Sequence, residues 1–575
     1  MGTRRESAVA NSLLARTGPN PAKSASTASS GNVATPFHWR LSSAIGLVAT
    51  LAAGSAGAQS TSGSADPIDK MQAQIKALEL EVQALKRKQG ARQDTTTPSN
   101  ATPNRGRKNP GSSDSVVAKR GPGAADGTRA AATPLAKTPD PTAVVKMSKG
   151  NRPSICTADG LNCLALTSRL HIDIGGYKYR PNTAATTPQG LDNGVNARRA
   201  RIGFQGTFMG DWNYALTYDF GGSSDGLPPV SGAPISGLQL AYISYTGFKP
   251  FAVEVGYQDL PYSLQEATSS NDPIFMELPS AQVVAANIAA GNYRSSAGIR
   301  GNDDRLWAGV YLTGPTSGTT HIAAPTATAA GSPGTVGSPG FAEQIGAFGR
   351  LTYQLWQDQF YSLHVGGDAE FLLRPPGNGT LTLSDRPELR IDPTPILSTG
   401  AIANIAHAQV YSAEAAAGAG SLFFQGEYFW FNVERALHRP PLQFNGGYAE
   451  ASWTITGERR KYNPDAGAYF GVVPDHPFSW AAGEWGAWAI AARYSYMNLN
   501  DLVTRGVPTS VTFGAAGGVQ SVYTFGLNWY VNRNVRLLFD YLHGRVDKFN
   551  GVAPNLGADT GAKFNALAMR TQVFF

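Results

Sequence analysis

Residues 201–220 read RIGFQGTFMGDWNYALTYDF, and this stretch decides the fold class. Its large apolar side chains fall at every second position on either side of a short Met-Gly-Asp turn. These positions are Ile202, Phe204 and Phe208 before the turn and Trp212, Tyr214, Leu216, Tyr218 and Phe220 after it. Side chains alternate between the two faces of a β-strand. The stretch therefore predicts a hairpin with one aromatic-rich face and one small, polar face, as expected for lipid outside a barrel and water inside.

The same alternation returns at the C-terminal end of the chain. Apolar side chains occupy every second position in residues 488–496, 523–531, 535–541 and 567–575. The last residue, Phe575, is aromatic and ends the last of these stretches. An aromatic terminus on an alternating strand is typical of a bacterial outer-membrane barrel.

Length then sets the number of strands. The roughly 410 residues from Leu164 onward, taken in steps of about 25 residues, correspond to about 16 strands. Short turns alternate with long Gly/Pro-rich segments, such as Gly314–Gly340 and Pro375–Ala408, which suit periplasmic turns and extracellular loops. The predicted fold class is all-β: a transmembrane antiparallel β-barrel over residues 164–575, preceded by a short coiled-coil helix and a disordered linker.

Composition narrows the class of protein further. Charged residues make up 15% of the chain and aromatics 10%, with 65 glycines, whereas a soluble globular protein has roughly 25% charged residues. The net charge is +7, but residues 1–163 hold 21 basic and 10 acidic residues and the remainder holds 27 and 31. Because the barrel part is slightly acidic, the overall charge does not indicate a nucleic-acid partner.

The N-terminus reads as an export signal. Residues 1–58 combine an unusually long n-region, an apolar core at residues 41–53 and the small residues Ala56-Gly57-Ala58, so we expect cleavage after Ala58. A start codon placed too early would explain the length of the n-region equally well, and a buried core helix is the alternative for the apolar run. Export predicts the bacterial outer membrane as the location of the barrel, with the N-terminal segment in the periplasm.

Residues 66–89 carry a heptad pattern that predicts a coiled-coil segment. Apolar side chains at its a and d positions are Ile68, Met71, Ile75, Leu78, Val82 and Leu85. Three heptads are too short to be stable alone, so the segment would associate only where the barrels already hold the chains together. An amphipathic helix lying on its own barrel is the alternative.

Residues 90–153 are rich in Thr, Pro, Ala, Gly, Ser and basic residues, and this composition predicts a low-complexity linker. Contact of this N-terminal segment with peptidoglycan, as a cell-wall tether, is an alternative role for it. Cys156 and Cys163 follow the linker. In an exported protein this pair is a candidate disulfide rather than a metal site, because no other Cys or His cluster lies nearby.

Several motifs occur in order along the barrel region. They include Arg198-Arg-Ala-Arg-Ile-Gly-Phe-Gln-Gly-Thr, Gly210-Asp-Trp-Asn-Tyr, Pro261-Tyr-Ser-Leu-Gln-Glu, Phe275-Met-Glu, Gly526-Leu-Asn-Trp-Tyr and Arg570-Thr-Gln-Val-Phe-Phe. With these motifs the chain resembles the phosphate-selective porin O and P family from about residue 165 to 575. The resemblance implies a homotrimer of 16-stranded barrels, with a loop folded into each pore and arginines along an anion path.

The resemblance places part of an anion site on the pair Arg198 and Arg199. By alternation, Arg199 and Arg201 face the lumen, while Arg198 stays unassigned at the strand end. Guanidinium groups are permanently charged and bind phosphate oxygens bidentately; the alternative for each arginine is a carboxylate partner that only stabilises the wall. The other candidate lumen arginines are Arg493, Arg536 and Arg570.

The candidate constriction loop, about residues 263–293, departs from the phosphate-selective pattern. It contains Glu266, Asp272 and Glu277 but no Lys or Arg, and Leu278 follows the Phe-Met-Glu motif where the family commonly has a basic residue. Carboxylates in a narrow pore attract cations and repel phosphate. The nearest basic residues that can offset them are Arg294 and Arg300.

The sequence shows no pattern typical of an enzyme. The eight histidines are dispersed, and H-E-x-x-H, G-x-S-x-G and P-loop motifs are absent. We therefore predict no catalytic site, no metal and no cofactor. The predicted function is passive diffusion of small hydrophilic solutes and ions through an outer-membrane porin, with anions such as phosphate as the specific candidate. A general or cation-preferring porin with a tethering N-terminal segment is the alternative.

Overall fold

The computed structural model describes residues 143–148, 152–182, 190–221, 237–291, 293–316, 344–376 and 379–575. The predicted signal segment 1–58 and coiled coil 66–89 lie outside these residues and stay predictions. Most of the predicted linker 90–153 lies outside them too. Its described end forms strand β1 (Val144–Ser148) and the beginning of β2 (Arg152–Cys156).

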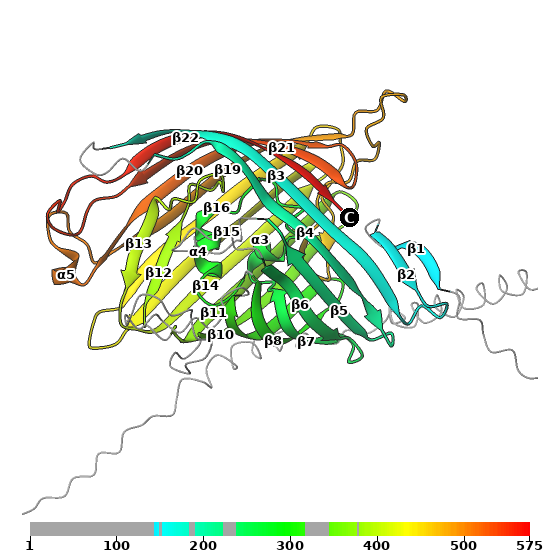
Figure 1. The fold of residues 1–575 in the computed structure, drawn as a ribbon, viewed down its shortest axis with the longest axis horizontal. Coiled ribbons are helices and arrows are strands. Elements are labelled where there is room, and N and C mark those ends of the chain that lie inside the picture. The colour runs from blue at the N-terminus through cyan, green and yellow to red at the C-terminus, as the bar shows by residue number, and fades with distance from the viewer. Residues whose placement is uncertain are drawn as a thin grey trace, which may run out of the picture. The chain divides into compact units, whose positions relative to one another are not determined.

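One sheet of 18 strands contains the barrel, which closes through all of them except β1 and β2 (Figure 1). Closure joins β3 to β22, where Pro181 pairs with Ala562 and Arg169 pairs with Phe574. This confirms the predicted antiparallel barrel of about 16 strands. The barrel strands are β3 (Cys163–Pro181), β4 (Gly194–Phe208), β5 (Trp212–Asp219), β6 (Gly237–Tyr245), β7 (Phe251–Asp259), β8 (Tyr293–Asn302), β9 (Leu306–Thr316), β10 (Ile345–Gln357), β11 (Tyr361–Arg374), β14 (Ile405–Ala419), β15 (Leu422–Arg435), β16 (Leu442–Thr454), β19 (Ala487–Asp501), β20 (Ala515–Tyr530), β21 (Val535–Asp547) and β22 (Ala562–Phe574).

Alternation separates a membrane face from a lumen face. On β5, Leu216 and Tyr218 are 50% and 42% exposed, whereas Thr217 and Asp219 between and after them are buried. Apolar side chains are stable on the outer face because lipid tails surround it in a membrane, while the inner face carries polar and charged groups.

A β-bulge in β4 interrupts the alternation. His171 of β3 pairs with Arg199 and Ile172 pairs with Ala197, so Arg198 is the extra residue. A bulge changes the direction of a side chain relative to its neighbours. Because of it, the two consecutive residues Arg198 and Arg199 are both buried. The sequence leaves Arg198 unassigned because it predicts that Arg198 lies at the strand end; in the structure the strand begins at Gly194, and the bulge lets Arg198 be buried beside Arg199.

Most connections are short at one barrel end, as at residues 209–211 and 531–534, and most are long at the other. In an outer-membrane barrel the short turns are periplasmic. The long connection between β7 and β8 carries helices α3 (Ser263–Ala267) and α4 (Ser280–Ala286). Its described residues, 260–291, lie inside the barrel, where α4 contacts β15, β16 and β19 (Figure 1). We call residues 260–291 the constriction loop. A further short helix, α5 (Thr509–Thr512), lies between β19 and β20. In the described part of the chain, no helix is both long and apolar enough to cross a membrane.

The segment Pro375–Ala408 differs from the predicted extracellular loop. It contains β12 (Leu381–Asp385) and β13 (Leu397–Ile402), which pair with each other, and β14 already begins within it. Leu383 and Leu397 are buried in the same apolar cluster as α4, so this hairpin folds inward. The other predicted loop, Gly314–Gly340, lies outside the described residues except for the end of β9.

The hairpin of β1 and β2 extends the sheet at the short-turn end. Ser154 of β2 pairs with Ala165 of β3, beyond the point where β22 ends. Cys156 and Cys163 are joined by a disulfide that links the two strands.

Gly544 of β21 provides a test of lumen packing, because it pairs with Phe564 of β22. A Cβ atom at Gly544 would lie 2.0 Å from the Cζ atom of Phe564, a residue with no exposed surface. We expect Gly544→Ala to lower the free energy of unfolding by about 1–3 kcal/mol, the usual cost of overpacking. Gly349→Ala is the matched control, since the nearest atom to its Cβ would be 3.7 Å away. Urea unfolding in detergent micelles measures both variants, and equal midpoints would contradict this packing.

Candidate functional site

The six arginines that the sequence placed in or near the lumen form one continuous part of the wall. Each is at most 6% exposed. They come from β4, β19, β21 and β22, which lie on the same side of the barrel because β22 pairs with β3 and β3 with β4. We call this group the arginine wall: Arg198, Arg199, Arg201, Arg493, Arg536 and Arg570.

A group of carboxylates stands on the neighbouring strands β11, β14, β15 and β16. No motif in the sequence marks these carboxylates, although each occupies a lumen position of its strand. All are at most 5% exposed. We call this group the acid wall: Asp368, Glu370, Glu414, Glu427 and Glu450.

The acid wall binds backbone N–H groups of the constriction loop. Glu427 accepts hydrogen bonds from the N–H groups of Leu264 and Gln265, at 2.7 and 3.2 Å. Glu370 accepts one from Ala290 at 2.6 Å. Carboxyl oxygens thus satisfy backbone donors at both ends of the loop, which would be costly to leave unpaired in a buried position.

The arginine wall binds backbone carbonyl groups from the middle of the same loop. Arg536 donates to the carbonyl oxygens of Asn271 and Ile274, at 3.2 and 3.3 Å. Arg493 donates to the carbonyl oxygen of Glu277 at 2.8 Å. The loop therefore spans the lumen between two walls of opposite charge.

The side chain of Glu277 is held by two arginines of the wall. Its carboxylate receives two hydrogen bonds from Arg198, at 2.7 and 3.1 Å, and one from Arg570 at 2.6 Å. Arg570 is also paired with Asp173 at 2.7 Å. Burial alone would raise the pKa of Glu277, but Arg198 and Arg570 hold it well below its ordinary value.

The other carboxylates of the loop are also engaged. Glu266 accepts a hydrogen bond from Gln282 at 2.7 Å. Burial raises the pKa of Asp272, against the opposing effect of Arg460 and Arg536. The sequence predicts that these acids act on the permeating ion, whereas in the structure they are buried or bonded within the loop and its supports.

The basic residues near the loop have structural partners as well. Arg294 donates to the carbonyl oxygens of Ala286 and Gly291, at 3.0 and 3.2 Å, and so fastens the end of the loop. Arg300 is paired with Glu254 at 3.0 Å. On the arginine wall, Arg201 is paired with Asp219 at 2.8 Å.

The inward hairpin of residues 379–402 brings a second set of charges into the lumen, which the loop predicted at residues 375–408 did not include. Glu388 accepts a hydrogen bond from Arg493 at 2.9 Å and one from the N–H of Ser280 at 3.0 Å. Arg390 lies 3.5 Å from both Glu277 and Asp385. The hairpin therefore meets the arginine wall and the constriction loop at the same place.

Arg386 of this hairpin is different from its neighbours. It is 7% exposed, its Nε has no hydrogen-bond partner, and within the part of the chain that the structure describes its guanidinium makes no hydrogen bond or ion pair. Burial, together with the positive charges of Arg390 and Arg198, lowers its pKa to about 10. Arg386 therefore keeps its charge at neutral pH and has free donors beside two further guanidiniums.

Residues 164–575 match the family model described as phosphate-selective porin O and P. The chain belongs to this porin family. Porin O of Pseudomonas aeruginosa is 24% identical over 453 residues, which cover 74% of this chain and 92% of that protein. An uncharacterized protein of Caulobacter vibrioides is 26% identical over 416 residues, covering 71% of this chain and 73% of that protein. Among solved structures, an anion-selective porin from Comamonas acidovorans is 12% identical with a TM-score of 0.41, covering 72% of this chain and 100% of that one.

Membership of the porin family establishes the function of the barrel and its cellular location. The protein is a passive channel of the bacterial outer membrane. The lumen described above is its permeation path.

One carboxylate group of the porin could hold a cation by distance alone. Oxygen atoms of Asp368, Glu414 and Glu427 lie within 4.8 Å of one another. Arg350 stands among them, 2.8 Å from Glu414 and 3.5 Å from Asp368, and His364 lies 2.8 Å from Glu414. Arg350 and His364 thus already occupy oxygen atoms of Glu414 and Asp368, which makes the group a structural part of the acid wall.

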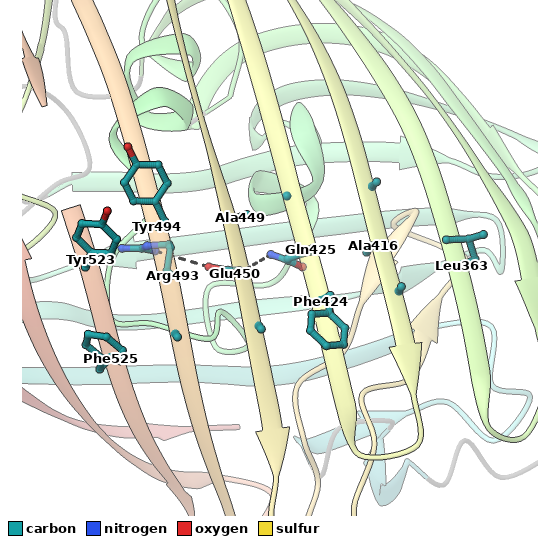
Figure 2. A pocket seen from close by; sticks show the side chains of 15 residues that line it. Leu363, Ala416, Phe424, Gln425, Ala449, Glu450, Arg493, Tyr494, Tyr523 and Phe525 are labelled. Carbon is teal, nitrogen blue, oxygen red and sulfur yellow. Dashed lines mark hydrogen bonds and ion pairs between the residues drawn. The ribbon is translucent and has the colours of Figure 1, made fainter. Parts of the chain in front are cut away.

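Figure 2 shows how the two faces of the porin wall differ across β15, β16 and β19. On the lumen side, Gln425 donates to Glu450 at 2.6 Å, and Arg493 lies 3.8 Å from the same carboxylate. On the membrane side, Phe424 and Tyr494 border a groove of about 600 Å³ with a floor of alanines. Because this groove opens on the membrane face, it is not part of the permeation path.

The role of Glu277 as the anchor of the constriction loop is testable with Glu277→Gln. This change keeps the size of the side chain but leaves Arg198 and Arg570 without its negative charge. Breaking a buried pair by removing one partner costs about 3–5 kcal/mol, so we expect a loss of this order in the free energy of unfolding. Glu484→Gln is the control, because the Glu484 side chain is 43% exposed. Urea unfolding in detergent micelles that gives the same midpoint for both variants would rule out the anchoring role.

Proposed function

We propose that this porin passes small anions, with phosphate among them, and that Arg386 is a binding point on the path. The observation that carries the proposal is the free guanidinium of Arg386, buried beside Arg198 and Arg390. A weakly hydrated, permanently charged fork binds phosphate oxygens in pairs and still releases them. Diffusion down a gradient then needs no energy source.

The pairing of the constriction-loop acids supports an anion path over a cation path. Glu277 is compensated by Arg198 and Arg570, and Glu266, which accepts a hydrogen bond from Gln282, is attracted by the positive charge of Arg294. A carboxylate whose charge is balanced at short range contributes little field to a passing ion. Arg386, whose guanidinium forms no ion pair with the described residues, then has the larger effect on selectivity.

We also propose a homotrimer as the working assembly, with outer-membrane lipid around its outer face. The predicted coiled coil at residues 66–89 supports the association of chains. Exposed apolar side chains on the barrel wall, such as Val310 at 62% and Phe525 at 55%, support the contact with lipid.

The anion proposal predicts the reversal potential of the purified porin in a planar bilayer under a KCl gradient. We expect the potential to favour chloride and added phosphate to block the current. Arg386→Gln removes a charge-assisted hydrogen bond worth about 1.5 kcal/mol or more, so half-block should need about tenfold more phosphate. Arg533→Gln, at an exposed residue of the turn between β20 and β21, is the matched control and should leave the block unchanged.

The outcomes separate two kinds of failure. A potassium-favouring potential of the unaltered porin would reject an anion path altogether. A chloride-favouring potential with the same phosphate block in Arg386→Gln and Arg533→Gln would keep the anion path but reject Arg386 as its binding point.

Acidification should strengthen the preference for chloride through Asp385. Burial raises its pKa to about 6, against the opposing effect of Arg390. When the pH falls from 7.5 to 5, this carboxyl gains a proton, and one negative charge beside Arg390 and Arg386 is lost. We expect a larger chloride-to-potassium permeability ratio at pH 5, from reversal potentials at the two pH values. Asp385→Asn lacks the charge at both, so an equally large pH effect in this variant would refute the assignment.

A further inference from the structure

The connection between β16 and β19, residues 455–486, joins the lumen to the outer surface of the porin. It lies at the barrel end where most connections are short turns. Its first half carries the strand pair β17 (Tyr462–Asn463) and β18 (Ala468–Tyr469) and contacts helix α3 inside the barrel. We call residues 455–486 the strap.

The inner part of the strap supports the constriction loop and the acid wall. Arg350 donates to the carbonyl oxygens of Ala466 and Gly467, at 2.9 and 2.7 Å. Arg460 of the strap donates to the carbonyl oxygen of Asp272 at 2.6 Å. The strap therefore contacts the backbone of the constriction loop directly, and a shift of the strap would change this contact.

The outer part of the strap stands against the membrane face of the barrel. The carbonyl oxygen of Trp485 accepts hydrogen bonds from the indole N–H groups of Trp488 and Trp529, at 3.2 and 2.8 Å. These two indoles stack with their centroids 5.2 Å apart. Trp529 belongs to the membrane face because Asn528, its neighbour on β20, is fully buried in the lumen. The strap thus leaves the lumen and ends on the outer wall.

The tip of the strap, residues 478–485, exposes large aromatic side chains. Trp480 is 80% exposed and Trp485 is 58% exposed, with their ring centroids 6.1 Å apart. Phe478 packs edge-on against Trp529 at 5.5 Å. The tip therefore continues the aromatic surface of the membrane-facing wall beyond the strand ends. An indole, with its apolar ring and its polar N–H group, is most stable at the boundary between lipid tails and water.

We propose that the strap tip is seated in the headgroup region of the membrane leaflet at the short-turn end, with phospholipid as its partner. The seat holds one end of the strap at the membrane, while the other end supports the carbonyl of Asp272 in the constriction loop. This contact does not depend on which ion the porin passes.

The experiment places a fluorescent reporter on the tip. Ala482→Cys in the full-length porin is labelled with a nitrobenzoxadiazole probe and reconstituted in vesicles of phosphatidylcholine and phosphatidylethanolamine. The two native cysteines form a disulfide, so the label reacts with the new thiol alone. Asp304→Cys, in the exposed turn between β8 and β9, is the matched control. We expect a blue-shifted emission at the tip and stronger quenching by lipids with a doxyl group near the headgroup.

A second variant separates the aromatic seat from simple proximity. Trp480→Ser with Trp485→Ser in the labelled background should lose the blue shift and the doxyl quenching, and heat-dependent migration on a gel checks that the barrel is folded. Emission and iodide quenching equal to those of the Asp304→Cys label would overturn the proposal, because the tip would then lie in water. A label shielded from both doxyl lipid and iodide would also overturn it, since a neighbouring protein would then cover the tip.

Discussion

A loop that crosses the inside of a barrel must find partners for its backbone N–H and C=O groups, because each buried unpaired group costs about 1–3 kcal/mol. This porin meets the requirement with two walls of opposite charge. Glu427 and Glu370 accept from N–H groups near the two ends of the constriction loop, and Arg536 and Arg493 donate to carbonyl groups in its middle. The polarity of the peptide group thus decides which part of the loop lies against which wall.

The same arrangement explains why a count of charges does not predict ion selectivity. Among the described residues, 14 carboxylates and 11 arginines are buried, a balance that would favour cations if all were free. Most of the named pairs hold the loop or the wall, as Arg198 does with Glu277 and Arg201 with Asp219. Selectivity then depends on the charged groups that form no such ion pair. Arg386 is one of them, and it lies in a hairpin that folds back into the lumen.

Period-two alternation was enough to predict the barrel, its approximate strand number and the inward direction of Arg199 and Arg201. It could not assign Arg198 to a face of the strand. A β-bulge interrupts the period locally, and no residue pattern in the sequence marks its position. It also could not find the hairpin with Arg386, since a Pro- and Thr-rich composition indicates a loop without giving its direction. The carboxylates at the constriction were visible in the sequence, but their partners come from strands far away in the chain. Charge type is a property of the sequence, whereas charge balance is a property of the fold.

The sequence separation between hydrogen-bonded residues also determines the order of steps in assembly. Glu277 lies 293 residues before Arg570, which comes from the last strand of the barrel. Contacts between such distant residues form only after the intervening chain is in place, because closing a long loop costs entropy before the contact stabilises it. Arg570 reaches Glu277 only when β22 has paired with β3, and Arg460 reaches the carbonyl of Asp272 only when the strap has entered from the other end. The constriction loop therefore gains these contacts only after the barrel has closed. The pore narrows only in a closed barrel.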